Sequence, residues 1–306
     1  MEISPKVSIL IPTFNYSHFI GEAIQSALNQ TYTDFEIIIV DDGSTDNTDE
    51  VVAKYLNDTR ITYYKNPVNL GLVENFNKCL SYAKGEYIKF LLADDKFEPS
   101  LLEKFVPIME KYPNVSLVTS NRDMFGTKVK KRNLPFTGLQ EGKKVIFESL
   151  REKNGNWIGE PTTVMFRRAD LRVGNFNPAY YCLVDWEMWL RLLCIGDCFI
   201  IPETLSYFRV HSSQASQKIL KDYKYTFEEY FFYKEIQIHN RYQLDLSKLE
   251  INKIIKKRAA YCAKAMYRLL PRIYQRKERS ILVKAFKIAN QEKVLLSPLR
   301  GIIKIV

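Results

Sequence analysis

Over about the first 120 residues, short apolar runs alternate with segments in which apolar side chains recur at helical spacing. The runs that we expect to form buried strands are residues 6–12, 35–40, 61–64 and 86–92. Helical spacing is clear after the first run, at Ile20, Ala23 and Ile24. Strands separated by helices predict an α/β fold, with a mostly parallel sheet flanked by helices. Gly85 is expected to close a helix in the left-handed conformation.

The alternation is less regular beyond about residue 120. The basic segment 127–133 is expected to be rich in turns. Further helices and short strands are predicted, the helices over residues 185–194, 217–240 and 251–294 and the strands over residues 198–202 and 206–210.

Charge divides the chain into two parts. The whole chain has 45 basic and 35 acidic side chains, a net charge of +10. Residues 251–306 hold 15 Lys and Arg against Glu278 and Glu292, a net charge of +13, so the rest of the chain is close to neutral. We therefore predict a body of residues 1–215 and a helical, basic C-terminal region of residues 216–306.

Several protein classes are disfavoured by the sequence. No stretch approaches the roughly 18 to 20 consecutive apolar residues that a membrane-spanning helix needs. The first residues lack the organisation of a signal peptide, so the chain is expected to be cytoplasmic. Five cysteines at irregular spacings suit reduced thiols better than disulfides. Cys194, Cys198 and His211 as zinc ligands are the alternative, but a fourth ligand is missing.

Two pairs of carboxylates follow two of the predicted strands. Asp41 and Asp42 come after the second strand, and Asp94 and Asp95 come after the fourth. One such pair alone would be interpreted as a turn, but ligands of wound sheets bind at the carboxyl ends of strands. Oxygen ligands suit Mg²⁺ or Mn²⁺, which typically bridge to phosphates. We therefore expect a nucleotide diphosphate bound through a metal, since the two common phosphate-binding motifs, GxxxxGK[ST] and GxGxxG after the first strand, are lacking.

Five segments contain further motifs, namely residues 7–15, 27–36, 40–46, 83–86 and 92–95. In order and spacing, this string of motifs resembles the N-terminal half of family 2 glycosyltransferases. These are inverting enzymes of the GT-A fold that include many enzymes of bacterial surface-polysaccharide synthesis. The resemblance extends over about residues 5–215. It implies a nucleotide-sugar half at about 1–120 and an acceptor half at about 121–215.

The resemblance also implies roles for residues near the nucleotide. Pro12 and Phe14 would lie beside the base, and Asp42 would accept a hydrogen bond from it, although Phe14 is as well explained as a core residue. Asn69 and Gly71 match a loop that approaches the nucleotide or its phosphates. The remaining matches imply that Asp94 contacts the ribose and that Asp95 holds the divalent ion, which would be Mn²⁺ or Mg²⁺. His211 would lie near the diphosphate or its metal.

Two positions depart from the family pattern. Leu92 replaces an acid that many relatives have two residues before the second Asp pair, and we expect Leu92 in the core. Val184 replaces the first acid of the segment that contains Asp185. The resemblance makes Asp185 the general base, and inversion requires only one base to take the proton of the acceptor hydroxyl. An N-cap role for Asp185 is compatible with this function.

The sequence also predicts how three neighbours of Asp185 are used. Glu187 is expected to pair with Arg191 across one helical turn. Trp186 and Trp189 suit either stacking on sugar rings or core packing.

The function expected is transfer of a sugar from a nucleotide-diphosphate donor, with UDP favoured, to a glycan or lipid-linked glycan acceptor. The alternatives are a non-catalytic relative that binds a nucleotide sugar, and a protein that binds nucleic acid through its basic tail. No nucleic-acid motif occurs in the tail, so we expect no nucleic-acid partner. The tail instead suggests peripheral attachment to the anionic inner face of the cytoplasmic membrane. Its apolar stripe includes Ile255, Ala259, Cys262, Met266 and Leu269.

Overall fold

The computed structural model describes residues 4–151, 155–212, 214 and 223–299, without the side chains of residues 276, 277 and 299. The chain divides into two compact units, one of residues 1–150 and 154–212 and the other containing residues 213–306. Residues 217–222 of the predicted helix lie outside the described residues.

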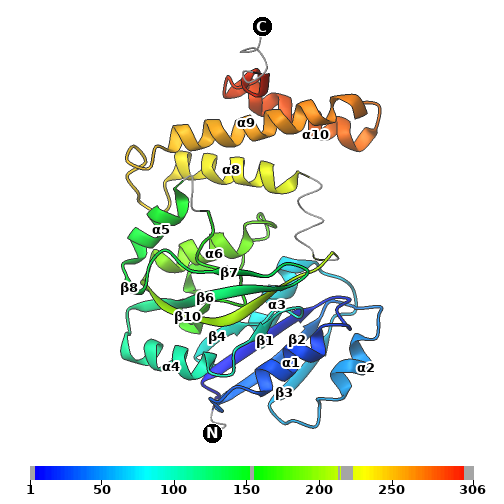
Figure 1. The fold of residues 1–306 in the computed structure, drawn as a ribbon, viewed down its shortest axis with the longest axis vertical. Coiled ribbons are helices and arrows are strands. Elements are labelled where there is room, and N and C mark those ends of the chain that lie inside the picture. Colours follow the sequence, from blue (N-terminus) through cyan, green and yellow to red (C-terminus); the bar gives the residue numbers. More distant parts are fainter. Residues whose placement is uncertain (1–3, 152–154, 213, 215–222, 300–306) are drawn as a thin grey trace. The chain divides into compact units, whose positions relative to one another are not determined.

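Four parallel strands form one half of the sheet of the first unit (Figure 1). Their order is β3-β2-β1-β4, with bounds Ile61–Lys65, Phe35–Asp41, Val7–Thr13 and Tyr87–Phe90. Every residue of β1 is buried, as expected for a central strand of a parallel sheet with both faces covered. The predicted α/β fold with its parallel strands is confirmed.

Helices α1 (Ile20–Leu28), α2 (Thr48–Ala53) and α3 (Leu72–Tyr82) connect these strands. Helix α4 (Leu101–Lys111) follows β4 and the short strand Lys96–Phe97. In α1 the buried residues are Ile20, Ala23, Ile24 and Ala27, the stripe that the sequence predicts. These side chains join those of β1 and β2 in the main apolar core.

The other half of the sheet is mixed, and the order continues from β4 as β9-β6-β10-β5. The strands are β5 (Lys96–Phe97), β6 (Val115–Gly126), β7 (Lys130–Arg132), β8 (Gly138–Gln140), β9 (Met165–Arg167) and β10 (Asp197–Val210). Two short strands were expected where β10 runs unbroken, with a register shift between Ile201 and Thr204. The basic segment expected to be turns contains β7, because the backbone of β6 offers it a partner.

Helices α5 (Gly142–Leu150) and α6 (Val184–Leu193) and a 3₁₀ helix (Arg168–Val173) complete the first unit. The predicted helix at residues 185–194 is therefore present, shifted by one residue.

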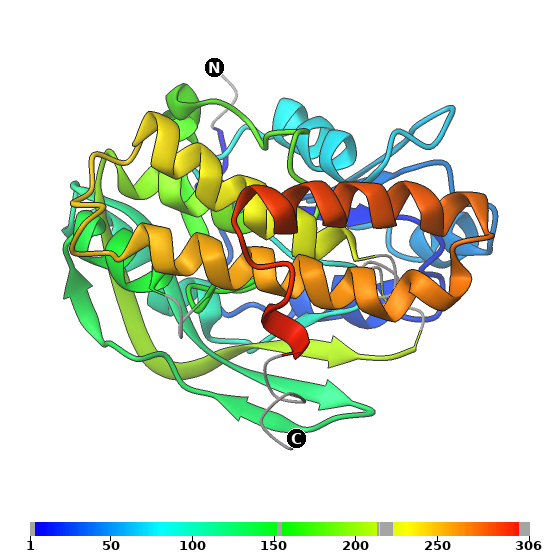
Figure 2. The ribbon, with the colours of Figure 1, turned by 90° about the horizontal axis from the view of Figure 1, so that it is seen from above.

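The second unit is helical. It contains α8 (Lys224–His239), α9 (Ile251–Leu269) and α10 (Arg276–Gln291), with 3₁₀ turns at Leu270–Arg272 and Ser297–Leu299. Helices α9 and α10 lie side by side (Figure 2), and α9 also packs on α8. Among the described residues, no helix has both the length and the apolar character needed to cross a membrane.

Gly85 does not close a helix in the left-handed conformation, so that prediction is wrong. Helix α3 ends at Tyr82, and Ala83 at its C-cap is extended. Gly85 is buried against β1, and its N–H donates to Ser8 Oγ at 2.8 Å. A Cβ on Gly85 would lie 2.5 Å from the backbone nitrogen of Ser8. Close packing of backbone on backbone, not a positive φ, therefore explains this glycine.

We predict that Gly85→Ala lowers the free energy of unfolding by about 1–3 kcal/mol, because the added methyl must displace a central strand. Urea denaturation followed by circular dichroism measures the change. Gly21→Ala is the control, since a Cβ on Gly21 meets only side-chain atoms, the Tyr55 hydroxyl at 3.3 Å and Val51 Cγ1 at 3.5 Å, and alanine favours the helix. Equal stabilities of the Gly85→Ala protein and the wild type would contradict the steric explanation.

Candidate functional site

The loops that follow β1 and β2 are tied together at the carboxyl edge of the sheet. The N–H of Asn15 donates to Ser44 Oγ at 2.8 Å, and the N–H of Thr45 donates to Asn15 Oδ1 at 2.9 Å. Pro12 is buried in β1, whereas Phe14 directly after the strand is 41% exposed. An exposed ring beside this loop pair is available to a ligand, so the core alternative for Phe14 is wrong.

Asp41 is a structural residue of this edge. Its side chain is fully buried and accepts hydrogen bonds from Ser44 N–H at 2.9 Å and the Tyr63 hydroxyl at 2.9 Å. The ammonium group of Lys65 lies 3.9 Å from Asp41 Oδ2. Because these groups come from the turn after β2 and from β3, Asp41 holds the edge in shape.

Asp42 holds the loop that precedes α3. Its Oδ1 accepts from the Leu70 N–H at 2.8 Å and from Asn66 Nδ2 at 3.0 Å, and its Oδ2 accepts from the Gly71 N–H at 2.8 Å. Gly71 has φ of 89° at the N-cap of α3, a conformation that favours glycine. Asn69 is exposed on the same loop. The predicted nucleotide residues Asp42, Asn69 and Gly71 thus lie together.

Asp94 and His211 form a close pair. His211 Nε2 lies 3.0 Å from Asp94 Oδ2, and each side chain is 11% exposed. The imidazole ring packs against Phe19, with 4.6 Å between ring centroids. Asp94 follows β4 and His211 follows β10, so the sheet topology brings together residues 117 positions apart.

Asp95 is turned into the protein. It is 1% exposed, and its Oδ2 accepts from the Thr162 hydroxyl at 2.6 Å. Its Oδ1 accepts from the Arg209 N–H at 2.9 Å. Burial, together with the neighbouring charge of Asp94, raises the pKa of the Asp95 carboxyl well above its usual range.

Arg209 fixes the turn that contains both carboxylates. Its Nε donates to the carbonyl oxygen of Asp94 at 2.7 Å, and its guanidinium lies over the ring of Phe125, 4.2 Å from the centroid. It also forms an ion pair with Glu22. Sequence reasoning assigned no role to Arg209, although it lies only two residues before His211.

Leu92 differs from its prediction. Strand β4 ends at Phe90, and Leu92 is only partly buried in the turn that follows, whereas Leu91 and Ala93 are core residues. The N–H of Leu92 donates to the Thr162 hydroxyl at 3.1 Å. The apolar run misled the sequence prediction because it continues past the end of the strand.

Asp185 lies in the first turn of α6, where Leu183 occupies the N-cap. The N-cap alternative for Asp185 is therefore wrong, although the start of a helix still favours its negative charge. Asp185 Oδ1 accepts from the Trp186 N–H at 2.7 Å, and Oδ2 accepts from Asn156 Nδ2 at 3.3 Å. Burial raises the pKa of the Asp185 carboxyl to about 7, with a further increase from the negative charge of Glu160.

The segment of residues 156–163 connects the Asp94–Asp95 turn with Asp185. Thr162 binds Asp95 and Asn156 binds Asp185. Between them, Glu160 forms an ion pair with the buried Arg122 of β6. The charge of Glu160 raises the pKa of both Asp95 and Asp185, so both carboxyls lie within its electrostatic reach.

Sequence reasoning missed Glu160, Thr162 and Arg122. Nothing in the local pattern of residues 156–163 distinguishes this segment from an ordinary surface loop, because its partners are remote in the chain.

The burial of side chains on α6 decides the predictions for Glu187, Trp186 and Trp189. Glu187 is fully buried, and both its oxygens accept from Arg191 Nε at 3.0 Å, which confirms the predicted ion pair. Trp186 and Trp189 are buried, with Trp189 Nε1 donating to the Gly159 carbonyl at 2.9 Å. Core packing is therefore correct for both tryptophans, and stacking on sugars is not.

The donor set at Asp94 and His211 fits a divalent cation. A carboxylate oxygen and an imidazole nitrogen are suitable ligands for Mn²⁺. Within the described residues, no group of three or more His, Cys, Asp or Glu side chains could hold a metal ion. A cation at Asp94 and His211 would therefore need ligands from substrate phosphates or water, as is usual for such ions.

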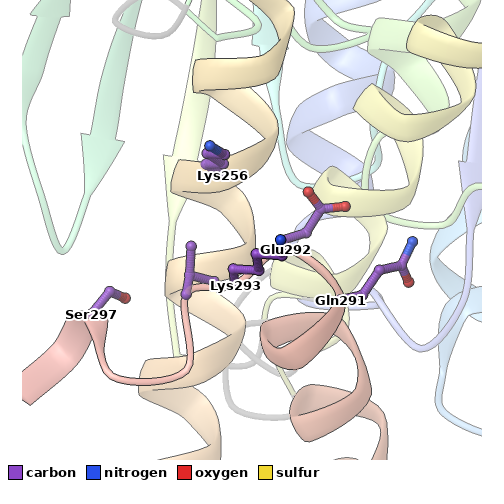
Figure 3. A pocket seen from close by; sticks show the side chains of 6 residues that line it. Lys256, Gln291, Glu292, Lys293 and Ser297 are labelled. Atoms are coloured by element: carbon purple, nitrogen blue, oxygen red, sulfur yellow. The ribbon is translucent and has the colours of Figure 1, made fainter.

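A pocket of about 320 Å³ lies within the C-terminal unit (Figure 3). Its lining residues are Lys256, Gln291, Glu292, Lys293, Val294 and Ser297. Glu292 is already bound by the Tyr230 hydroxyl at 2.8 Å and by Lys234 at 3.2 Å. No predicted nucleotide, metal or catalytic residue lines this pocket.

The sequence is similar to known glycosyltransferases. The model of the family "Glycosyl transferase family 2" matches residues 8–174. An uncharacterized glycosyltransferase of Haemophilus influenzae is 30% identical over 230 residues, which cover 71% of this chain and 69% of the relative. Chondroitin synthase of Pasteurella multocida is 33% identical over 223 residues, which cover 72% of this chain but only 22% of that larger protein.

Solved structures share the fold. Residues 1–349 of S. aureus TarS, crystallised with UDP-GlcNAc, align with a TM-score of 0.69 at 18% identity, covering 96% of this chain and 85% of that one. A mannosyltransferase of Pyrobaculum calidifontis in complex with GDP-Man and Mn²⁺ aligns with a TM-score of 0.57 at 15% identity, covering 96% and 88%. The family match and the architecture together identify the chain as a glycosyltransferase of family 2 with the GT-A fold.

Proposed function

We propose that this protein transfers a sugar from a nucleoside diphosphate donor, with UDP favoured, to a hydroxyl of a glycan or lipid-linked glycan. One observation carries the proposal: the Asp94–His211 pair and the carboxylate of Asp185, whose pKa is raised, belong to one cluster joined by residues 156–163. The UDP-GlcNAc bound to TarS and the GDP-Man bound to the Pyrobaculum enzyme support a nucleotide-sugar donor.

The nucleoside is proposed to bind at the edge formed by β1, β2 and the loop before α3. Phe14 offers an exposed ring for stacking on the base, with Pro12 beneath it in β1. Asp42 is proposed to face the base while it holds the loop of Asn69 and Gly71. These side chains would orient the donor so that its diphosphate points toward Asp94.

Asp94 and His211 are proposed to hold Mn²⁺ or Mg²⁺ at the diphosphate. This assignment differs from the sequence prediction, which placed Asp94 at the ribose and Asp95 at the metal. Asp95 already accepts hydrogen bonds on both oxygens and is buried, whereas Asp94 faces His211. A bound cation would neutralise the charge of the leaving diphosphate.

Asp185 is proposed to act as the general base. Its carboxylate would take the proton of the acceptor hydroxyl while that oxygen bonds to the anomeric carbon of the donor sugar. The bond from this carbon to the diphosphate oxygen breaks on the opposite face, which inverts the configuration. A base with a pKa near 7 accepts a proton efficiently at neutral pH. Asn156 and the Trp186 N–H orient the carboxylate.

We predict that Asp185→Asn lowers kcat by at least about 10²-fold, because the amide cannot take the proton. The affinity for UDP should change less than about twofold, which calorimetric titration measures. In the wild type, kcat/KM should fall as the pH drops through about 7, because Asp185 becomes protonated.

Two results would count against this role. Near-normal transfer by the Asp185→Asn protein would exclude Asp185 as the base. UDP binding without any turnover by the wild type, over a panel of donors and acceptors, would favour the non-catalytic alternative. Asp170→Asn, a carboxylate on the 3₁₀ helix Arg168–Val173, is the matched control.

We predict that Asp94→Asn and His211→Ala each weaken UDP binding in the presence of Mn²⁺ by about tenfold or more, because both remove a ligand of the ion. With EDTA present, wild type and variants should bind UDP equally weakly. Asp95→Asn should instead lower the melting temperature, since it disturbs a buried hydrogen-bonded group. A Mn²⁺-dependent affinity that is lost only in the Asp95→Asn protein would restore the original metal assignment.

The C-terminal unit is proposed to attach to the anionic inner face of the cytoplasmic membrane. The apolar stripe that was expected to contact the membrane packs inside the protein instead. Its residues are all buried, namely Ile255, Ala259, Cys262, Met266 and Leu269. Exposed apolar side chains occur instead at the turn between α9 and α10, where Leu270, Ile273 and Tyr274 lie among arginines. This combination suits a bilayer interface, where apolar groups insert and cations contact anionic headgroups.

We predict that the full chain co-sediments with vesicles of phosphatidylglycerol and phosphatidylcholine at low salt and is released at high salt. Replacing Ile273 and Tyr274 by Ser should lower the bound fraction at least about threefold, since each loses apolar area at the interface. Ile238→Ser on α8 is the control, because the exposed fraction of Ile238, 67%, lies between those of Ile273 and Tyr274, and Ile238 is remote from this turn in the sequence. Equal binding to vesicles of phosphatidylcholine alone would contradict the charge-dependent attachment.

A further inference from the structure

A basic hairpin projects from the first unit between β6 and β7. Residues 127–133 contain four cations and no acid: Lys128, Lys130, Lys131 and Arg132. All residues of this segment are exposed, and Val129 at the tip is 82% exposed. None of the functional roles proposed above uses these cations.

The turn of the hairpin is fixed beside the site. The N–H and the hydroxyl of Thr127 both donate to the carbonyl oxygen of Val210 at 2.9 Å. Gly126 has φ of 90°, and a Cβ there would lie 2.6 Å from the same oxygen. Because Val210 directly precedes His211, the turn of the hairpin lies next to the Asp94–His211 pair.

Cross-strand pairing assigns the hairpin cations to two faces. Arg132 lies opposite Arg122 and Lys130 lies opposite Met124, whereas Lys131 lies opposite Asp123. Directly opposite residues of antiparallel strands point to the same face, and successive residues alternate. Lys130 and Arg132 therefore share a face with Arg122, and Lys131 is on the other face.

Arg122 is on the face of the hairpin that contacts the segment of residues 156–163. Arg122 forms an ion pair with Glu160, and Glu160 acts electrostatically on Asp185. Phe136, shortly after β7, packs on Trp157 of the same segment, with ring centroids 5.5 Å apart. Lys130 and Arg132 are thus on the side of the hairpin that adjoins the proposed base.

Charge on this face is unbalanced. Two arginines directly opposite one another repel unless anions compensate them. Glu160 compensates Arg122, but Lys130 and Arg132 make no ion pair with any acid in the part of the chain that the structure describes. Exposed guanidinium and ammonium groups on one face form hydrogen bonds well with phosphate oxygens.

We propose that Lys130 and Arg132 bind phosphate groups of the acceptor, as in a lipid diphosphate, and so hold its hydroxyl near Asp185. This inference rests on the proposed function and adds the residues that recognise the acceptor. The diphosphate of the donor is assigned to Asp94 and His211. The face of the hairpin with Lys130 and Arg132 instead adjoins Glu160 and the proposed general base, Asp185. The exposed Val129 at the tip suits the apolar chain of such an acceptor.

The test uses the full chain, with farnesyl diphosphate as the probe and UDP with Mn²⁺ as the donor-side control. Replacing Lys130 and Arg132 by Gln should weaken farnesyl diphosphate binding by at least about tenfold in calorimetric titration, with UDP affinity changed less than about twofold. Replacing Lys128 and Lys131 by Gln removes the same charge from the same hairpin but should change the probe affinity less than about threefold.

Melting temperatures separate binding from folding. The Lys130 and Arg132 variant should be as stable as the wild type, because these side chains are exposed and Arg132 faces another cation.

Three results would overturn the inference. Equal loss of probe binding in both double variants would indicate net charge alone. A loss of UDP affinity in the Lys130 and Arg132 variant would assign the hairpin to the donor. Binding of UDP but not of farnesyl diphosphate by the wild-type protein would exclude this acceptor chemistry and leave the proposed function intact. A wild-type protein that does not bind UDP would instead count against the proposed function itself.

Discussion

The buried carboxylate of Asp95 joins three segments that are far apart in the chain. It accepts hydrogen bonds from Thr162 and from the backbone of Arg209, which lie 67 and 114 residues away. A buried carboxylate without such partners would cost several kcal/mol, so the turn after β4, the segment 156–163 and the end of β10 must meet in one arrangement. Asp94 and His211 come together because this arrangement places them side by side.

A buried lysine side chain also holds the segment of residues 156–163 in place. Lys89 of β4 is fully buried and donates to the carbonyl oxygens of Thr162 and Val164. Burial lowers the pKa of its ammonium group well below the usual value. Thr162 is therefore held through its carbonyl by Lys89 while its hydroxyl binds Asp95. Rigid support of this kind keeps the Asp94–Asp95 turn and Asp185 in fixed relation, which group transfer requires.

The carboxylates near this edge of the sheet therefore have different roles. Asp41 and Asp95 accept hydrogen bonds from other parts of the protein, and Asp42 anchors the loop before α3. Asp94 faces an imidazole, and Asp185 keeps a raised pKa at the start of α6. Differences in burial and in hydrogen-bond donors, not differences in residue type, separate these side chains. The ion pair of Arg122 and Glu160 then connects this edge with the basic hairpin.

The alternation of strands and helices, the stripe of α1 and the pairing of Glu187 with Arg191 follow from the sequence alone, because each depends on neighbours within one element. The sequence also places the Asp pairs at strand ends. Only the tertiary structure decided which carboxylate faces which partner. Asp94 and Asp95 are adjacent and chemically identical, and Thr162, Arg209 and His211 distinguish them from across the fold. The same holds for Gly85, whose constraint comes from the backbone of β1, and for the apolar stripe of α9, which is buried because α8 and α10 pack on it.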